Sequence, residues 1–591
     1  MVKLTINYIK QYNNRLLYTV SMAAVLLMLL TSCTGAALKP ADFGEVATKA
    51  TEKEIVVAEF DPQTLYALLA GEIAGQQGDM ATALKYYLPA AENNEDTRIA
   101  ARAARIAIYA KQNDLALRAS KRWLALSPDD QQAMKISIIA LLRSNQAEAA
   151  GLQMRDLIKS IRQDEQVTDK QAFAAVAKLL QNEAETSDAV LVFKSLSHYY
   201  KDNAQVFLWL SRYAMQAGQY DQALPAISRV IELDPENAKA YVLKGRLLAL
   251  SGKQVEALQA MLLAVNKQPD DFMLRKQYAG MLIRQSKLED ASAQFEILFK
   301  VRPDDRETII SLGILLLEKN DTERAVSVFK RLQNNPQSAN EALYYLGRVD
   351  EVKKNYSEAL ARYQQVEQGR LYFDAQLRIA SLFAYTDQLE SAVKTLQALV
   401  LGEDNSEKKA QVYLLHGRIL QNAGDSKSAI AIYSSALDEL PTNIELLYAH
   451  ALAAESLDMI DSAVAGFKKL LTHEPENIQA LNALGYTLAD RTERFQEALE
   501  YILKAFKLKP DDSAILDSLG WVKFRLGKLD EALKWLQQAF EINVDAEIAA
   551  HLGEVLWKMG RIDDANEVWQ NLPEEMKQHR RLQETIKRLK K

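Results

Sequence analysis

The chain has 591 residues, of which 48% are hydrophobic and 25% charged, and it contains 22 glycines and 13 prolines. Its formal net charge of −6 is small for this length, which argues against the broad basic surface that nucleic-acid binding needs. The low share of glycine and proline favours an all-α body with a water-exposed surface.

The chain begins with a pattern typical of an export signal. Lys3, Lys10 and Arg15 precede an apolar run over residues 16–30, and a basic segment followed by a short apolar core is the order found in secretory signals. The run covers about 15 residues, fewer than the roughly 20 that a membrane-spanning helix needs. We therefore expect residues 1–32 to be a signal peptide that is removed.

The end of this run carries a more specific mark. Leu30-Thr31-Ser32-Cys33 resembles the lipobox of bacterial lipoproteins, and the resemblance implies cleavage before Cys33 and lipidation of its thiol. Cys33 is also the only cysteine of the chain, which fits an oxidising compartment. Thr34 stands where an aspartate would retain an enteric lipoprotein at the inner membrane. We expect an outer-membrane anchor that faces the periplasm of a Gram-negative bacterium, with residues 33–60 as a lipidated tether.

From there on an alanine recurs with a period of about 34 residues, which indicates a solenoid of stacked units. A small residue usually precedes it by twelve positions, a large residue follows it by four, and a proline often follows it by twelve. Such a pattern suits two helices that cross closely at small side chains, with the proline ending the second helix. The recurring alanines are Ala83, Ala116, Ala149, Ala189, Ala223, Ala257, Ala291, Ala325, Ala359, Ala392, Ala429, Ala463, Ala498, Ala532 and Ala565.

This pattern resembles the tetratricopeptide repeat, and it predicts about 15 helix-turn-helix units. Turns such as Gly218-Gln219-Tyr220-Asp221 and Ala423-Gly424-Asp425 should end the first helix with glycine and cap the second with Asp or Ser. We expect divergent helical repeats over residues 61–200, where residues 64–150 are degenerate repeats or plain helical hairpins. Repeats should follow over 201–401 and 402–572, and a basic capping helix over 573–591. Two longer intervals predict bulging loops, near residues 162–170 and 402–409.

The repeat resemblance also implies where partners bind, because the first helix of each unit lines the concave face of such a stack. Residues at the exposed positions of these helices are our candidates, since Arg, Tyr and Trp dominate protein-binding hot spots. For Trp535 and Trp569 packing within the stack is the expected role, and for Tyr486 and Trp521 both roles stay open. The candidates are Arg212, Arg246, Tyr344, Arg348, Arg418, Tyr448, Tyr486, Trp521, Phe524 and Trp557.

No catalytic constellation stands out. The six histidines show no i, i+4 pair typical of a metal helix, and the chain has no Gly-rich phosphate loop, Gly-x-Ser-x-Gly motif or Cys/His cluster. We therefore expect no enzyme activity, no metal and no cofactor. The basic segment 577–591 carries Leu582, Ile586 and Leu589 on one helical face, which favours a capping helix; contact with anionic lipid or an acidic partner is the alternative.

A closer resemblance covers the runs 481–491, 517–521 and 549–557. These look like a group of proteobacterial outer-membrane lipoproteins that includes the adaptor of a periplasmic carboxyl-terminal processing protease. The resemblance implies a scaffold that binds this protease and its substrates, which are cell-wall hydrolases. Two other hypotheses remain: an assembly factor for an envelope machine (secretin and pilus assembly or exopolysaccharide export), and an enzyme acting on the cell wall through a carboxylate pair.

Overall fold

The structure is a computed structural model that describes residues 61–163 and 166–591. Cys33, the expected signal peptide and the tether lie outside the described residues. Within them the chain is all-α, as expected, and no helix is long and apolar enough to cross a membrane. The helices of the first half are α2 (Pro62–Gln76), α3 (Met80–Glu92), α4 (Thr97–Tyr109), α5 (Asn113–Leu126), α6 (Gln131–Arg143), α7 (Ala147–Ile161), α8 (Asp169–Glu183), α9 (Thr186–Tyr199), α10 (Ala204–Gln216), α11 (Tyr220–Leu233), α12 (Ala238–Leu250), α13 (Gln254–Lys267), α14 (Phe272–Arg284), α15 (Leu288–Val301) and α16 (Arg306–Glu318).

The second half continues in the same manner, except that two short 3₁₀ helices lie between its first two α-helices. Its helices are α17 (Thr322–Phe329), η2 (Lys330–Asn334), η3 (Pro336–Ser338), α18 (Ala339–Val352), α19 (Tyr356–Gln364), α20 (Tyr372–Tyr385), α21 (Leu389–Leu401), α22 (Ser406–Asn422), α23 (Ser426–Glu439), α24 (Ile444–Ser456), α25 (Ile460–His473), α26 (Ile478–Arg491), α27 (Phe495–Leu508), α28 (Ser513–Arg525), α29 (Leu529–Ile542), α30 (Ala546–Lys558), α31 (Ile562–Gln570), α32 (Glu574–Lys577) and α33 (Arg580–Leu589).

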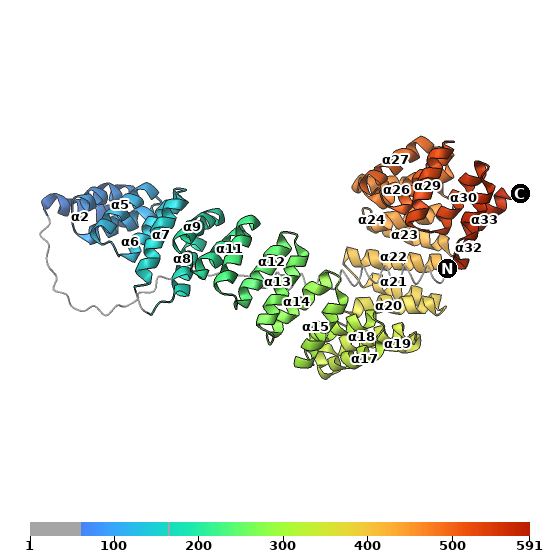
Figure 1. Cartoon of the computed structure of the whole chain (residues 1–591), viewed down its shortest axis with the longest axis horizontal. Helices are drawn as coiled ribbons and strands as arrows, with labels where there is room; N and C mark the ends of the chain where they lie inside the picture. The colour runs from blue at the N-terminus through green and yellow to red at the C-terminus, as the bar shows by residue number, and fades with distance from the viewer. Residues whose placement is uncertain (1–60, 164–165) are drawn as a thin grey trace. The chain divides into compact units, whose positions relative to one another are not determined.

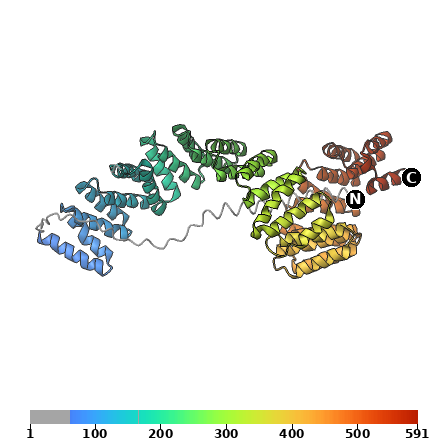
Figure 2. The same ribbon diagram turned by 90° about the horizontal axis from the view of Figure 1, so that it is seen from below.

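The chain divides into two compact units, unit 1 (Met1–Leu312) and unit 2 (Gly313–Lys591). Within each unit most consecutive helices pack as pairs, such as α12 with α13 in unit 1 and α28 with α29 in unit 2. Figure 1 labels these pairs in chain order, and Figure 2 shows the same stacking from a second side. The described helices α2 to α31 make fifteen successive pairs, which agrees with the expected number of repeats.

The crossing of each pair depends on a small residue opposite a large one. A Cβ added to Gly347 would lie 2.8 Å from the Tyr363 ring, and one added to Gly245 would lie 2.9 Å from the Met261 side chain. Such distances are shorter than side-chain carbons tolerate, so glycine lets the two helices approach. The recurring alanine beside this contact is fully buried, as at Ala257 and Ala359. The sequence pattern of small residue, alanine and large residue is therefore the packing of the pair itself.

Turn chemistry ends and starts the helices. Gly218 and Gly424 adopt a left-handed backbone (φ 71° and 84°) directly after a first helix, as expected. The predicted cap of the second helix holds at Asp425, whose carboxylate accepts a bond from the Ser428 amide at 3.0 Å. The predicted cap is wrong for α11. This helix begins after Gln219 without a side-chain cap, and Asp221 already lies inside its first turn. Most side-chain caps instead start first helices, as Asp271 does for α14.

The divergent segment follows the same plan. Helices α2 to α7 pack as three pairs, which fits both degenerate repeats and plain helical hairpins over residues 64–150. The exception is the next pair, in which α9 packs mainly on α7 and α10 and only slightly on α8. This irregular pair coincides with the 40-residue interval between Ala149 and Ala189.

Candidate protein-binding surface

In unit 1 the two candidate arginines lie on the surface, on neighbouring first helices. Arg212 on α10 and Arg246 on α12 are both exposed. The guanidinium of Arg212 lies 4.9 Å from the ring centre of Trp209, which holds it in place by a cation–π contact. These arginines are 34 residues apart, one repeat period, so the same side chain recurs at the same place in consecutive units.

In the first part of unit 2 the candidates belong to a polar network. Tyr344 on α18 is only 5% exposed, and its hydroxyl accepts a bond from Arg378 Nε on α20 at 3.1 Å. Arg378 also donates to Glu351 at 2.8 Å, and Arg348 lies 3.9 Å from the same carboxylate. Tyr363 donates its hydroxyl to Glu351 as well. The network holds α18, α19 and α20 together through charged groups.

Electrostatics explain why this network is stable. Burial alone would lower the pKa of Arg378, but the charge of Glu351 raises it well above its ordinary value. For Tyr363 burial acts in the opposite direction, because it disfavours the charged phenolate, and it raises the pKa of this hydroxyl far above that of a free phenol. Arg378 therefore stays charged and Tyr363 stays neutral near neutral pH.

Two further candidates on the next first helices are partly accessible. Arg418 on α22 is half-buried and takes part in an interaction. Tyr448 on α24 is half-buried too, with its ring centre 5.8 Å from that of Phe467 in an edge-to-face contact. Both side chains are therefore partly accessible to a partner.

The last repeats bring side chains from α26, α28 and α30 into one cluster. Tyr486 on α26 donates its hydroxyl to Glu547 on α30 at 3.0 Å, so these two helices face each other across α28. Trp521 on α28 is 6% exposed; its indole donates to Asp490 at 3.1 Å and stacks on His551, with ring centres 4.2 Å apart.

A buried histidine and carboxylate lie at the centre of this cluster. His551 Nδ1 lies 2.9 Å from an oxygen of Asp517, and both side chains are almost completely buried. The Trp521 ring covers His551 from one side. A buried carboxylate is stabilised by such a partner, so this pair ties α28 to α30.

The last helix of the chain reaches the same cluster. Arg581 on α33 donates to Asp490 at 2.9 Å and lies 3.3 Å from Glu547. Its guanidinium also lies over the rings of Tyr486 and Trp521, at 5.5 and 5.9 Å from their centres. Burial would lower the pKa of Arg581, but Tyr486, Asp490 and Glu547 together raise it above its ordinary value. Arg581 is therefore a permanent cation at the centre of an acidic region.

A second arginine of α33 makes the stronger pair. Arg588 bonds Glu554 on α30 through both of its terminal nitrogens, at 2.9 and 2.5 Å. Glu554 is 4% exposed, and the guanidinium bonds both of its carboxylate oxygens. The expected capping role of this segment thus has an ionic part besides its apolar one.

The remaining aromatic candidates lie beside this cluster. Phe524 is half-buried, 5.1 Å from Trp521 between ring centres. Trp557 is half-buried and stacks on Trp569 at 6.0 Å. Trp569 itself is buried and donates its indole N–H to the Ala549 carbonyl at 3.0 Å, which confirms its expected packing role. Trp535 packs edge-to-face on Phe506 at 5.4 Å, also as expected.

The candidate residues differ in how accessible they are to a partner protein. Arg212 and Arg246 are open to a partner, while Tyr344 and Trp521 are too buried to be touched without rearrangement. The binding roles of all ten residues stay predictions.

Sequence reasoning missed Asp490, Glu547 and Arg378 as parts of these clusters. Nothing in residues 61–163 and 166–591 groups three or more His, Cys, Asp or Glu side chains as a metal site would.

One signal in the sequence identifies part of what was missed. The pairs Tyr344–Arg378, Asp517–His551 and Glu554–Arg588 are each separated by 34 residues. Residues one period apart occupy equivalent positions in adjacent helices of the stack. Complementary side chains at this offset are therefore predicted to touch.

The chain is similar to known tetratricopeptide repeat proteins. A family model described as tetratricopeptide repeat matches residues 187–272, 282–339, 310–375, 448–513 and 487–547, and a second model with the same description matches residues 410–441. The "TPR repeat-containing protein PA4667" of Pseudomonas aeruginosa is 32% identical over 516 residues, which cover 87% of this chain and 86% of that protein. The "Protein CTR9 homolog" of Arabidopsis thaliana is 26% identical over 51% of this chain and 28% of its own length.

Solved structures resemble the chain more distantly. The structure of Naa15/Naa10 bound to HypK-THB matches 89% of this chain and 96% of its own, at 12% identity and a TM-score of 0.35. The Cut9-Hcn1 hetero-tetramer of the APC/C matches 77% of this chain and 95% of its own, at 12% identity and a TM-score of 0.31.

Proposed function

The chain belongs to the tetratricopeptide repeat family, and from this premise we propose that it is a non-catalytic scaffold that holds periplasmic proteins at the outer membrane. Its most specific role in this proposal is that of an adaptor that brings cell-wall hydrolases to a carboxyl-terminal processing protease. Lipid on Cys33 anchors it, and the tether lets the repeats reach both partners.

One observation carries the scaffold part of the proposal. Arg212 and Arg246 repeat at the same exposed place on adjacent first helices, and an exposed row of identical side chains suits an extended partner that contacts several units. Fifteen helix pairs provide separate segments for separate partners. Holding two partners on one chain raises their effective concentration without any new chemistry. The adaptor part rests on the resemblance of residues 481–491, 517–521 and 549–557.

Capture from envelope extract tests this proposal. The bait is the chain with Cys33→Ala and a soluble tag, and bound proteins are identified by mass spectrometry. We expect a carboxyl-terminal processing protease and cell-wall hydrolases to be retained together. Retention of secretin, pilus or polysaccharide-export subunits instead would replace the adaptor role with that of an assembly factor.

Two matched variants assign the binding to the exposed arginines. Arg212→Glu with Arg246→Glu should reduce capture on the order of tenfold, because exposed arginine contacts are frequent hot spots. Lys253→Glu with Lys287→Glu makes the same charge change at exposed turn positions of unit 1 and should leave capture unchanged. Equal capture by both variants would remove this row of arginines from the binding surface.

A further inference from the structure

Helix α33 lies on an acidic face of the last three repeats. We define the acidic face by four carboxylates on the first helices of the last three repeats: Asp490 on α26, Asp517 on α28, and Glu547 and Glu554 on α30. Arg581 and Arg588 of α33 bond three of them. Charge complementarity, rather than a large apolar contact, therefore defines what this face accepts.

The pairing between α33 and α30 is in register. Glu547 and Glu554 are seven residues apart, and so are Arg581 and Arg588, which places each pair two turns apart on one side of its helix. Leu582, buried to 1% exposure, and the partly buried Ile586 and Leu589 lie beside the two arginines and join the core of the last repeat. The acidic face is thus complementary to one pattern, which is two arginines seven residues apart flanked by aliphatic side chains.

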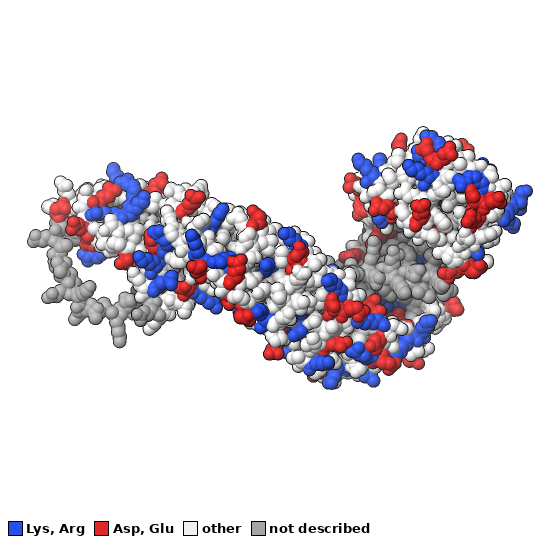
Figure 3. All heavy atoms as spheres, in the orientation of Figure 1, with Lys and Arg blue, Asp and Glu red and all other residues white. Residues whose placement is uncertain are grey.

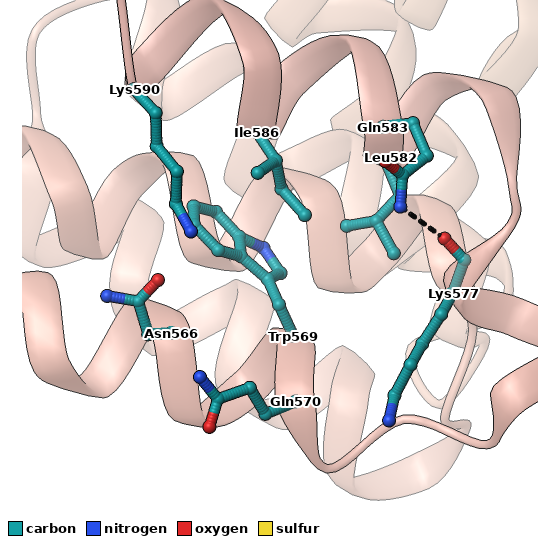
Figure 4. A pocket seen from close by; sticks show the side chains of 8 residues that line it. All are labelled: Asn566, Trp569, Gln570, Lys577, Leu582, Gln583, Ile586 and Lys590. Atoms are coloured by element: carbon teal, nitrogen blue, oxygen red, sulfur yellow. Dashed lines mark hydrogen bonds between the residues drawn. The ribbon is translucent and has the colours of Figure 1, made fainter.

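Few side chains of α33 are buried. Its buried residues are Leu582 and Thr585, two of ten, whereas ten of the thirteen residues of α30 are buried. The preceding helix α32 has no buried residue. A cavity of about 180 Å³ remains between α31 and α33, with Leu582 and Ile586 on one side and Trp569 and Gln570 on the other (Figure 4). The ionic contacts of Arg581 and Arg588 therefore supply much of what holds α33 in place.

The acidic face cannot stay empty without cost when α33 leaves. Glu554 is 4% exposed in the presence of Arg588, and a largely buried carboxylate that loses its partner is destabilising. Whatever replaces α33 must therefore supply guanidinium groups at the same two places. A chain that presents only lysines or only apolar side chains would leave the fork-shaped contact at Glu554 unmade.

We propose that α33 is an exchangeable occupant of the acidic face, and that the other occupant is an amphipathic helix of a partner protein carrying two arginines seven residues apart. This inference rests on the proposed scaffold function and names the chemistry of one class of its partners. Docked α33 lowers the apparent affinity for such a partner, because only the fraction of chains with α33 undocked is competent to bind.

A peptide with the sequence of residues 578–591 is the probe, and its binding to the full chain is measured by fluorescence anisotropy. We expect the variant Arg581→Glu with Arg588→Glu, whose own α33 no longer fits, to bind the peptide on the order of tenfold or more tightly than the unchanged chain. The matched variant Lys587→Glu with Lys591→Glu carries the same charge change on exposed residues at the end of the chain and should bind like the unchanged chain. Adding Glu554→Gln to the first variant should abolish the gain.

Several results would overturn the proposal. They are equal binding to all three chains, binding that survives Glu554→Gln, or equal binding of a peptide in which both arginines are glutamate. Self-association of the unchanged chain in sedimentation, lost in the Arg581→Glu and Arg588→Glu variant, would make a second copy the occupant instead. Circular dichroism confirms folding, and Arg581→Gln with Arg588→Gln serves as a milder undocked variant.

The two proposals fail separately. If the undocked variant gains no peptide affinity but still captures the envelope partners, the exchange of α33 is wrong and the scaffold function stands. If the variant gains peptide affinity while neither it nor the unchanged chain captures a protease, a hydrolase or an assembly subunit, the acidic face is real and the scaffold function is wrong.

Discussion

At the scale of single residues, stability is concentrated where a small residue meets a large one within a repeat. Gly347 and Tyr363 make such a contact in unit 2, and Gly245 and Met261 make one in unit 1. Both glycines lie inside helices, where glycine is intrinsically unfavourable by about 1 kcal/mol. Their presence there is explained by the ring or thioether that needs the space, and not by any turn.

Gly347→Ala tests this contact. The added methyl group must displace the Tyr363 ring, so we expect the free energy of unfolding of unit 2 to fall by about 1–3 kcal/mol, as overpacked cores do. Gly280→Ala is the control, because a Cβ there would meet only the end of Arg284 at 3.8 Å; it should be neutral or raise stability by up to about 1 kcal/mol. Urea unfolding followed by circular dichroism measures both, and equal effects would contradict the packing explanation.

His416 predicts how stability depends on pH. It is 4% exposed on α22, and burial lowers the pKa of its imidazole below the ordinary value of 6.5. The unfolded chain therefore binds a proton more readily than the folded chain once the pH falls below about 6.5. This contribution to stability is complete above that pH and is lost as the pH falls further.

His416→Gln should accordingly flatten the fall of the unfolding midpoint between pH 7 and pH 5. Thermal melts at a series of pH values measure the slope. His198→Gln, a change at an exposed histidine of α9, is the control and should keep the slope of the unchanged chain. An unchanged slope in the His416 variant would show that another group governs the acid sensitivity.

At the scale of elements, most repeats begin with a side-chain cap, although α18 and α20 have none. Asp271 caps α14 by accepting a bond from the Leu274 amide at 2.9 Å. Asn477 and Asp512 do the same for α26 and α28. Since loops between the helices are only a few residues long, these caps fix where each helix starts and thereby the register of the whole repeat.

Asp271→Ala should lower the free energy of unfolding of unit 1 by about 1 kcal/mol, the usual cost of removing an N-cap. Asp270→Ala, the neighbouring and exposed carboxylate, is the matched control and should change stability by less than about 0.5 kcal/mol. Thermal unfolding of both variants gives the comparison, and a loss of equal size in the two would mean that net charge, not capping, is responsible.

The period of the sequence predicts elements and close contacts well, and it predicts distant contacts poorly. It gives the helix pairs, the small-to-large contacts and, through the 34-residue offset, the Glu554–Arg588 pair. It does not give the contact of Arg581 with Asp490, which are 91 residues apart. That contact depends on how strongly α26, α28 and α30 curve toward one side, and curvature is the sum of small rotations that no single residue sets.

At the scale of the whole molecule, charge is distributed rather than concentrated. On the face shown in Figure 3, acidic and basic side chains are interspersed over both units, in keeping with a net charge of −6 over 591 residues. In the proposals made above, local patches such as the acidic face select the partner. A mixed surface also limits non-specific attraction along so long an array.

The proposed lipid anchor makes a prediction for the chain as a whole. Cys33→Ala should move the protein from the membrane fraction to the soluble periplasmic fraction and abolish incorporation of labelled fatty acid, because a single thiol is proposed to carry the anchor. Ser32→Ala keeps a small residue before the cysteine and should leave both properties unchanged. Continued membrane association of the Cys33 variant would refute anchoring through this residue.

Reconstituted proteolysis tests the adaptor account most directly. A purified carboxyl-terminal processing protease and a cell-wall hydrolase are incubated with and without this chain, and the amount of intact hydrolase is followed on gels. The account predicts rapid loss of the hydrolase only when all three proteins are present, with loss slowed on the order of tenfold by Arg212→Glu and Arg246→Glu together. Equal loss of the hydrolase with and without the chain would contradict it.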